Sequence, residues 1–524
     1  MKRRSFLRSA LGSSITTTTA LVASLPWLPG CGGGGGSASP TEPAPHAVTI
    51  NVDAAATGIA VNRRVLGSNV EWVDRGDNLL DSSGHFDPTM LGLVQAMSPA
   101  VLRYPGGLQS DTFHWEQADN EHAFTRAMQP TLMTPQRLLE LCEATGAEPL
   151  FTVNVVTGSA DEAARWVHAA NIDRAVSSIT GRPLPRVDFW EIGNEPYLKV
   201  DSRPDLDIAP AEFARRANLF IRAMRAVDPT IRIGLPLTQD TRNDLPVTPY
   251  PGFARTVLDG LTEPFDFVAV HNAYLPFAYT AGASTNDLYA GAIAAAESVR
   301  DDFVRMRALL AELRPGATIP LAVTEHAPLF SLGLGATDDW STTPLGALYL
   351  ADLLRVFADT PDLLLANHWS LSGNGRFGAL GGNDGSGTGG FNRASADVLT
   401  LASQVLHGNR LDVAITCESV ATPAIGLVPA RSALPLMSAL ITREGNTLRA
   451  LLIHKDSTRD AQVRFDLAGA SAGRASLTTL TAPDVTRTDN APGLWQRSVT
   501  APAGGTSVAL NLPPHSVVLL ELTM

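Results

Sequence analysis

The chain has 524 residues, a net charge of −12 and 44% hydrophobic residues. This length can bury one large core or several smaller ones. The negative charge, with no basic run beyond the first residues, argues against nucleic acid as a partner. The sequence contains no His-Glu-x-x-His, Cys-x-x-Cys or Walker-type motif, so neither a metal nor another cofactor is expected.

Residues 1–31 have the features of an export signal. Arg3 and Arg4 precede a mildly apolar stretch, which is typical of a twin-arginine (Tat) signal. The following "LPGC" resembles a lipoprotein processing box that ends at Cys31, although cleavage nearby by an ordinary signal peptidase is an alternative. Residues 32–46 form a Gly/Ser/Pro-rich linker. We therefore expect an exported protein, periplasmic or at the cell surface, attached to the membrane only through a lipid on Cys31.

Residues 62–400 alternate between short apolar runs and longer amphipathic segments. The short runs predict eight strands, at 65–72, 100–107, 148–155, 187–196, 231–237, 265–274, 319–327 and 363–371. Between them lie helical patterns such as 134–146, which starts with Thr134 and Pro135 and closes at Gly146. Eight strands that alternate with helices predict an α/β fold, a (β/α)₈ TIM barrel.

Residues 401–524 differ in character. They contain short β-rich runs broken by turn residues, and Val463, Phe465 and Leu467 alternate with polar residues. This pattern predicts a C-terminal β-sandwich. A strand-like segment at 47–61, which precedes the predicted barrel in the chain, could also join that sandwich.

Two glutamates lie close together in "WEIGNEP". Glu191 is in the body of the predicted strand, whereas Glu195 stands about 13 Å further along it, at about 3.3 Å per residue. Because the groups that do chemistry in such barrels lie at the C-terminal ends of the strands, Glu195 is the catalytic candidate. Glu191 is expected to lie deep in the barrel or to be paired there.

A second carboxylate follows the same rule. Glu325 in "LAVTEHAP" is predicted at the end of the seventh strand. Two such carboxyl groups suit the cleavage of a glycosidic bond, in which one donates a proton and the other remains ionised. Arg103, at the end of the second strand, could hold one of them ionised.

These motifs also carry a family resemblance. "LRYPGG" followed by Trp115, "TVNVVTGSADEAARWVHAAN", "VDFWEIGNEP", "VAVHNAY" and the closing "LPPHSVVLLEL" occur in this order. The chain resembles the clan-A retaining glycoside hydrolases, and most of all the α-L-arabinofuranosidase family, over roughly residues 50–524. The resemblance implies a carbohydrate substrate.

The resemblance also implies roles for individual residues. Glu195 would be the acid/base and Glu325 the nucleophile. Asn194 would bind the sugar hydroxyl next to the anomeric carbon, Tyr274 would donate to the nucleophile, and Glu71 would bind the sugar.

Arg103 and three further residues at strand ends or in the adjoining loops complete the predicted substrate-binding set. Trp115 belongs to it through its place in the motif order. His271 is interpreted either as a substrate-binding residue or as a hydrogen-bonded structural histidine. Trp369 is interpreted either as a platform for sugar stacking or as a core tryptophan.

The sequence departs from the family at Leu108, where an asparagine that binds the furanose is usual, and at Thr324 and His326 beside the nucleophile. These departures keep open a clan-A β-glycosidase or β-glucuronidase. A surface lipoprotein that binds carbohydrate without catalysis is a third interpretation.

Overall fold

A computed structural model describes residues 44–117, 132–199, 204–238, 250–278, 283–331, 340–373, 377–382, 389–487, 493 and 495–524. The predicted export signal, Cys31 and most of the linker lie outside these residues. None of the described helices is both long and apolar enough to cross a bilayer.

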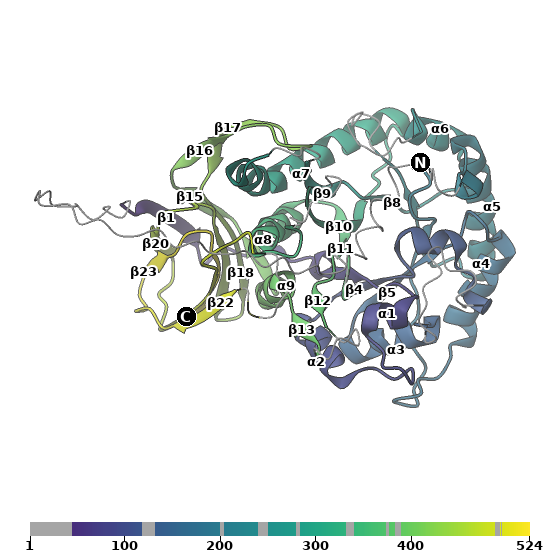
Figure 1. Ribbon diagram of the computed structural model, residues 1–524, viewed down its shortest axis with the longest axis horizontal. Coiled ribbons are helices and arrows are strands. Elements are labelled where there is room, and N and C mark those ends of the chain that lie inside the picture. Colours follow the sequence, from purple (N-terminus) through teal and green to yellow (C-terminus); the bar gives the residue numbers. More distant parts are fainter. Residues whose placement is uncertain are drawn as a thin grey trace, which may run out of the picture.

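Eight parallel strands form a closed barrel, which confirms the predicted fold (Figure 1). They are β3 (Gly67–Asn69), β4 (Val101–Tyr104), β5 (Glu148–Val153), β6 (Phe189–Ile192), β7 (Arg232–Pro236), β8 (Phe267–Val270), β10 (Leu321–Ser331) and β11 (Leu363–His368). The barrel closes because β11 pairs with both β10 and β3. A further strand, β9 (Ala273–Ala278), pairs with the extended C-terminal half of β10.

A helix follows each barrel strand. These helices are α2 (Pro88–Met97), α3 (Pro135–Thr145), α4 (Ala160–Val167), α5 (Pro210–Val227), α6 (Phe253–Gly260), α7 (Thr285–Leu313), α8 (Pro344–Asp359) and α9 (Ala394–Val405). The start and stop signals of α3 act as predicted, since the Thr134 hydroxyl accepts a hydrogen bond from the Arg137 amide and Gly146 adopts a φ of +74°.

The interior of the barrel is apolar near its N-terminal end and polar above it. The apolar layer contains Val101, Leu150, Phe189, Phe267, Ala322 and Leu365. Side chains two residues apart along a strand point to the same side. Two residues after Val101, Leu150 and Phe189, the strands carry Arg103, Thr152 and Glu191. The polar groups of the site therefore stand on a packed hydrophobic floor.

The rest of the chain forms a β-sandwich beside the barrel. One sheet has the order β15 (Val413–Thr416), β1 (His46–Asp53), β20 (Ala461–Ala468) and β23 (Ser507–Leu512). The other has the order β2 (Ile59–Ala60), β14 (Asn409–Leu411), β18 (Met437–Glu444), β19 (Thr447–His454), β24 (Val517–Thr523), β21 (Arg474–Thr481) and β22 (Gln496–Thr500). Because β1 pairs with both β15 and β20, the chain leaves the sandwich, forms the barrel and returns.

Two short hairpins complete the strands. The pair β12 (Leu380–Gly381) and β13 (Phe391–Asn392) lies on the barrel side, and β16 (Ser419–Thr422) pairs with β17 (Arg431–Pro435) on the sandwich side (Figure 1). The two cysteines outside the signal are separate free thiols, Cys142 in α3 and Cys417 in the sandwich.

Helices α8 and α9 stand between the barrel and the sandwich (Figure 1). A buried ion pair crosses this interface, since Nζ of Lys455 lies 2.5 Å from Oδ2 of Asp352 in α8. Arg355 binds the other Asp352 oxygen at 2.6 Å. Burial raises the pKa of Asp352, but Arg355 and Lys455 more than offset this, and the net pKa lies below its usual range.

Replacement of Lys455 by Met should weaken the attachment of the sandwich to the barrel. The change leaves a buried carboxylate without one of its two cations, which typically costs about 3–5 kcal/mol of unfolding free energy. Urea unfolding monitored by tryptophan fluorescence measures this loss. The matched control is Lys199→Met on the exposed surface, which should change stability by only about 0.5 kcal/mol. Equal stability of the two variants would contradict a structural role for this pair.

Candidate active site

The site is built around the guanidinium group of Arg103, whose side chain is 0% exposed. Its Nε donates to Glu191 at 2.6 Å, and one Nη donates to Glu325 at 2.8 Å and to Asn69 at 3.0 Å. The other Nη donates to the side-chain oxygen of Asn194 at 2.9 Å. Glu191 is buried and paired inside the barrel. Arg103 thus joins β3, β4, β6 and β10 at one level of the barrel.

Glu325 reaches this level through a β-bulge in β10. Val323 pairs with Ala366 and His326 with His368, so Thr324 and Glu325 together stand opposite a single residue of β11. The sequence predicted Glu325 at the end of its strand, but β10 continues to Ser331. The strand continues because its distal half pairs with β9. The bulge is what lets two consecutive side chains both reach the polar network.

Glu195 stands beyond the end of β6. That strand ends at Ile192, and Gly193 turns the chain with a φ of +80°. A Cβ at this glycine would lie 2.5 Å from Cγ1 of Val155, so a side chain there would be strained by both conformation and contact. After this turn, the Glu195 carboxyl accepts a hydrogen bond from the Tyr197 hydroxyl at 3.1 Å.

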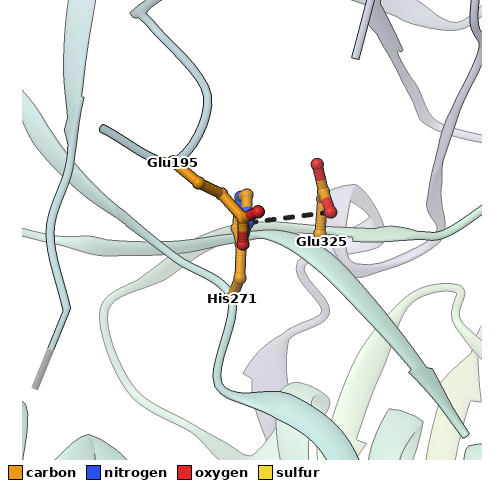
Figure 2. A group of neighbouring side chains, drawn as sticks. All are labelled: Glu195, His271 and Glu325. Carbon is orange, nitrogen blue, oxygen red and sulfur yellow. Dashed lines mark hydrogen bonds and ion pairs between the residues drawn. The ribbon is translucent and has the colours of Figure 1, made fainter. Parts of the chain in front are cut away.

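His271 lies between the two catalytic candidates (Figure 2). Its Nδ1 is 3.0 Å from Oε1 of Glu195 and 3.7 Å from Oε2 of Glu325. The nearest polar atoms of these three side chains all lie within 4.8 Å of one another. Such a trio could approach a cation, but the guanidinium of Arg103, 2.8 Å from Glu325, opposes a second positive charge. The arrangement is better suited to proton transfer.

The surroundings raise the pKa values of Tyr274, Tyr197 and His271. Burial, reinforced by the charge of Glu325, raises the pKa of Tyr274 well above its usual value, and burial with the charge of Glu195 does the same for Tyr197. Both phenols therefore remain hydrogen-bond donors. For His271, burial lowers the pKa, but Glu325 and Glu195 more than offset it, and the net pKa is raised.

Two predicted residues present hydrogen-bonding groups close to the two candidate glutamates. The Tyr274 hydroxyl donates to Glu325 at 2.7 Å. The side-chain oxygen of Asn194 is held by Arg103, while its buried Nδ2 has no acceptor among the described residues. A buried donor left unsatisfied is costly, so Asn194 is ready to receive an acceptor from a ligand.

The remaining predicted residues lie at different places around the barrel mouth. Trp369 is half-buried against Gly106 and Gly107, where a Cβ on Gly107 would lie 2.5 Å from the indole. Glu71 is two residues beyond β3 and partly exposed. The ring of Trp115, in a 3₁₀ turn (Trp115–Gln117), stacks at 6.1 Å on Trp166 of α4. The contacts of Trp115 are thus with α4.

Three polar residues that complete the site were not predicted to belong to it, although Thr324 was noted as a departure from the family. Tyr197 binds Glu195, Asn69 binds Arg103, and Thr324 joins Glu191 to His271. Tyr197 and Asn69 lie at or just beyond the C-terminal ends of barrel strands, so that position, which singled out Glu195, could have identified them. The contribution of Thr324 could be recognised only from the bulge in β10.

Comparisons with known sequences give partial matches. No protein-family model matches the chain. A stretch of 178 residues is 29% identical to the α-L-arabinofuranosidase C of Emericella nidulans and covers 30% of this chain and 34% of that protein. A second stretch, of 272 residues, is 24% identical to an intracellular exo-α-(1→5)-L-arabinofuranosidase of Acetivibrio thermocellus. It covers 47% of this chain and 50% of that protein. The matches thus span about a third to a half of these relatives.

Solved structures resemble the chain over most of its length. The α-L-arabinofuranosidase of Thermotoga maritima superposes with a TM-score of 0.71 and 19% identity, over 91% of this chain and 100% of that one. A family 51 α-L-arabinofuranosidase of Bifidobacterium longum gives a TM-score of 0.72 and 18% identity, over 91% and 99%. A family 44 xyloglucanase of Paenibacillus polymyxa superposes with a TM-score of 0.59 and 13% identity, over 91% of this chain and 100% of that one. The chain therefore shares their combination of a barrel with a β-sandwich.

Proposed function

We propose that the protein is a retaining glycoside hydrolase that removes terminal α-L-arabinofuranosyl groups from polysaccharides or oligosaccharides. The observation that carries this proposal is the convergence of Glu195 and Glu325 at the C-terminal end of a (β/α)₈ barrel, where one oxygen of each carboxyl group lies within 4.8 Å of one oxygen of the other. Retaining enzymes place their two carboxyl groups about 5–5.5 Å apart, whereas inverting enzymes need about 6.5–9.5 Å to admit a water molecule. The spacing supports retention.

In the first step, Glu325 acts as the nucleophile. Its carboxylate attacks the anomeric carbon, the bond from that carbon to the leaving oxygen breaks, and the leaving oxygen takes the proton of Glu195. Arg103 and Tyr274 donate to Glu325 at 2.8 and 2.7 Å and so hold its negative charge in place. The unused Nδ2 of Asn194 is the donor for the neighbouring sugar hydroxyl, an interaction that favours the transition state.

In the second step, the roles of the two glutamates reverse. Glu195, now ionised, takes a proton from water while the water oxygen attacks the anomeric carbon and the ester bond to Glu325 breaks. The sugar leaves with its original anomeric configuration, and Glu195 regains its proton. The chemistry requires no other reactant.

The substrate class rests on the relatives. Several proteins with similar sequences or folds are named α-L-arabinofuranosidases. Leu108, which is half-buried in the 3₁₀ turn after the paired glycines, leaves one polar contact to the sugar unmade, so β-glycosides and β-glucuronides belong in the test.

Glu325→Gln should abolish hydrolysis while preserving sugar binding. The amide cannot act as the nucleophile, so turnover of 4-nitrophenyl α-L-arabinofuranoside should fall by about 10⁴-fold or more, whereas calorimetry should still detect binding of an arabinofuranosyl oligosaccharide. The control is Glu312→Gln on the exposed surface of α7. If the unaltered chain cleaved only a nitrophenyl β-glucuronide or β-glycoside, that result would favour those activities instead. Binding of the sugar without any turnover would favour a non-catalytic protein.

Glu195→Ala should make the rate depend strongly on the leaving group. Without a proton donor, hydrolysis of an arabinofuranosyl oligosaccharide should fall by about 10²–10⁴-fold, while an acidic nitrophenol leaves without help. Added azide should then attack the glycosyl–Glu325 ester and yield an arabinofuranosyl azide of retained configuration, detectable by NMR. An azide of inverted configuration would contradict the retaining mechanism.

We also propose that the enzyme is exported through the Tat pathway and held at a membrane by a lipid on Cys31. The support is the sequence of residues 1–46, in which paired arginines, an apolar stretch, a cysteine and a flexible linker follow one another. A linker of this kind would let a tethered enzyme reach extended polysaccharides.

Cys31→Ser should release the protein from the membrane fraction. Incorporation of labelled fatty acid and fractionation of cells that express the full chain both report on this. Cys417→Ser, which alters a free thiol of the sandwich, is the control and should remain membrane-bound. Retention of the Cys31 variant in the membrane would argue against a lipid on that residue.

A further inference from the structure

We propose that Thr324 is a positioning residue whose hydroxyl fixes a hydrogen on Nε2 of His271, so that Nδ1 of His271 and Glu195 share a single proton. This inference rests on the proposed function, because it assigns the shared proton to the acid/base of that reaction. One chain of hydrogen bonds runs from Glu191, through Thr324 and His271, to Glu195.

The chain begins at the Glu191 carboxylate, which is 0% exposed. Three donors surround it: Nε of Arg103 at 2.6 Å, the hydroxyl of Thr152 at 3.0 Å and the hydroxyl of Thr324 at 2.9 Å. An ionised carboxylate only accepts hydrogen bonds. The single hydroxyl hydrogen of Thr324 is therefore directed toward Glu191.

The direction of the next hydrogen bond follows. Nε2 of His271 lies 3.0 Å from the Thr324 hydroxyl oxygen. Since that hydroxyl has already given its hydrogen to Glu191, its oxygen can only accept, and Nε2 must be the donor. This assigns the hydrogen of neutral His271 to Nε2 and leaves a lone pair on Nδ1.

The lone pair on Nδ1 faces Oε1 of Glu195 at 3.0 Å. One proton fits between these two atoms, either on Glu195, which is then the acid, or on His271, which then faces an ionised base. Among the described residues, the other charged groups near His271 are Glu325, 3.7 Å from Nδ1 and bound to Arg103, and Glu191, which lies behind Thr324 on the Nε2 side. The titratable phenols nearby are Tyr197, whose ring lies against His271, and Tyr274, which binds Glu325.

The shared proton is coupled to the state of Glu325. While Glu325 is ionised, its charge helps to retain a proton on the Glu195–His271 pair, which the first step requires. Once Glu325 has become an ester, that charge is gone, and His271 loses part of its affinity for a proton. Water can then supply the proton that returns to Glu195. The same pair thus serves both steps.

Thr324→Val tests the role of the hydroxyl, with Thr324→Ser as the matched control. In the valine variant nothing accepts from Nε2, so neutral His271 should carry its hydrogen on Nδ1 and donate to ionised Glu195. The ionised form of Glu195 is thereby favoured, and the alkaline limb of kcat/KM against pH should move down by about one pH unit. The serine variant should keep the original limb. An unmoved limb in the valine variant, or an equal movement in both, would overturn the proposal.

A second measurement does not depend on activity. Nitrogen-15 NMR of the full chain labelled at histidine, with His271→Asn to identify the signals, reports which nitrogen carries the hydrogen in the neutral ring. We expect Nε2 in the original chain and in Thr324→Ser, and Nδ1 in Thr324→Val. A hydrogen on Nδ1 in the original chain would overturn the proposal. Absence of arabinofuranosidase activity would instead overturn the proposed function and leave this assignment intact.

Discussion

The buried guanidinium of Arg103 is the interaction on which the site depends. Its four hydrogen bonds join Glu191, Glu325, Asn69 and Asn194, which come from β6, β10, β3 and the turn after β6. A planar group with donors in fixed directions can hold these partners at one level, whereas a lysine, with donors on a single nitrogen, could not. The charges are also mutually dependent, because loss of the cation would leave two buried carboxylates without their partner. Stability of the barrel and the ionised state of the proposed nucleophile therefore have the same origin.

Sequence patterns predicted much of this arrangement because the barrel imposes simple geometric rules. Strand and helix periodicity identified all eight repeats, and the observed strands lie within or overlap the predicted ranges. The rule that reacting groups lie at strand ends separated Glu195 from Glu191, four residues away, and the structure buries Glu191 against Arg103. Such predictions succeed where the position along a strand decides the environment of a side chain.

The remainder depended on local irregularity, which periodicity cannot reveal. An ideal strand would direct Thr324 and Glu325 to opposite faces, but the bulge in β10 brings both into the network. Similarly, Gly193 ends β6 earlier than predicted and carries Glu195 toward His271 through a turn rather than along a strand. A bulge depends on pairing with distant strands, so the local sequence around residue 324 does not encode it alone.

The balance of charge explains why one glutamate of the pair should keep a proton. Three carboxyl groups, of Glu191, Glu195 and Glu325, lie near the guanidinium of Arg103, and among the described residues full ionisation would leave more negative than positive charge in a largely buried space. A proton held between Glu195 and His271 removes one of them. Glu325 contacts Arg103 directly at 2.8 Å, whereas the described contacts of Glu195 are with a phenol and an imidazole. In the proposed mechanism, this contact with the cation suits Glu325 to attack and leaves Glu195 to donate the proton.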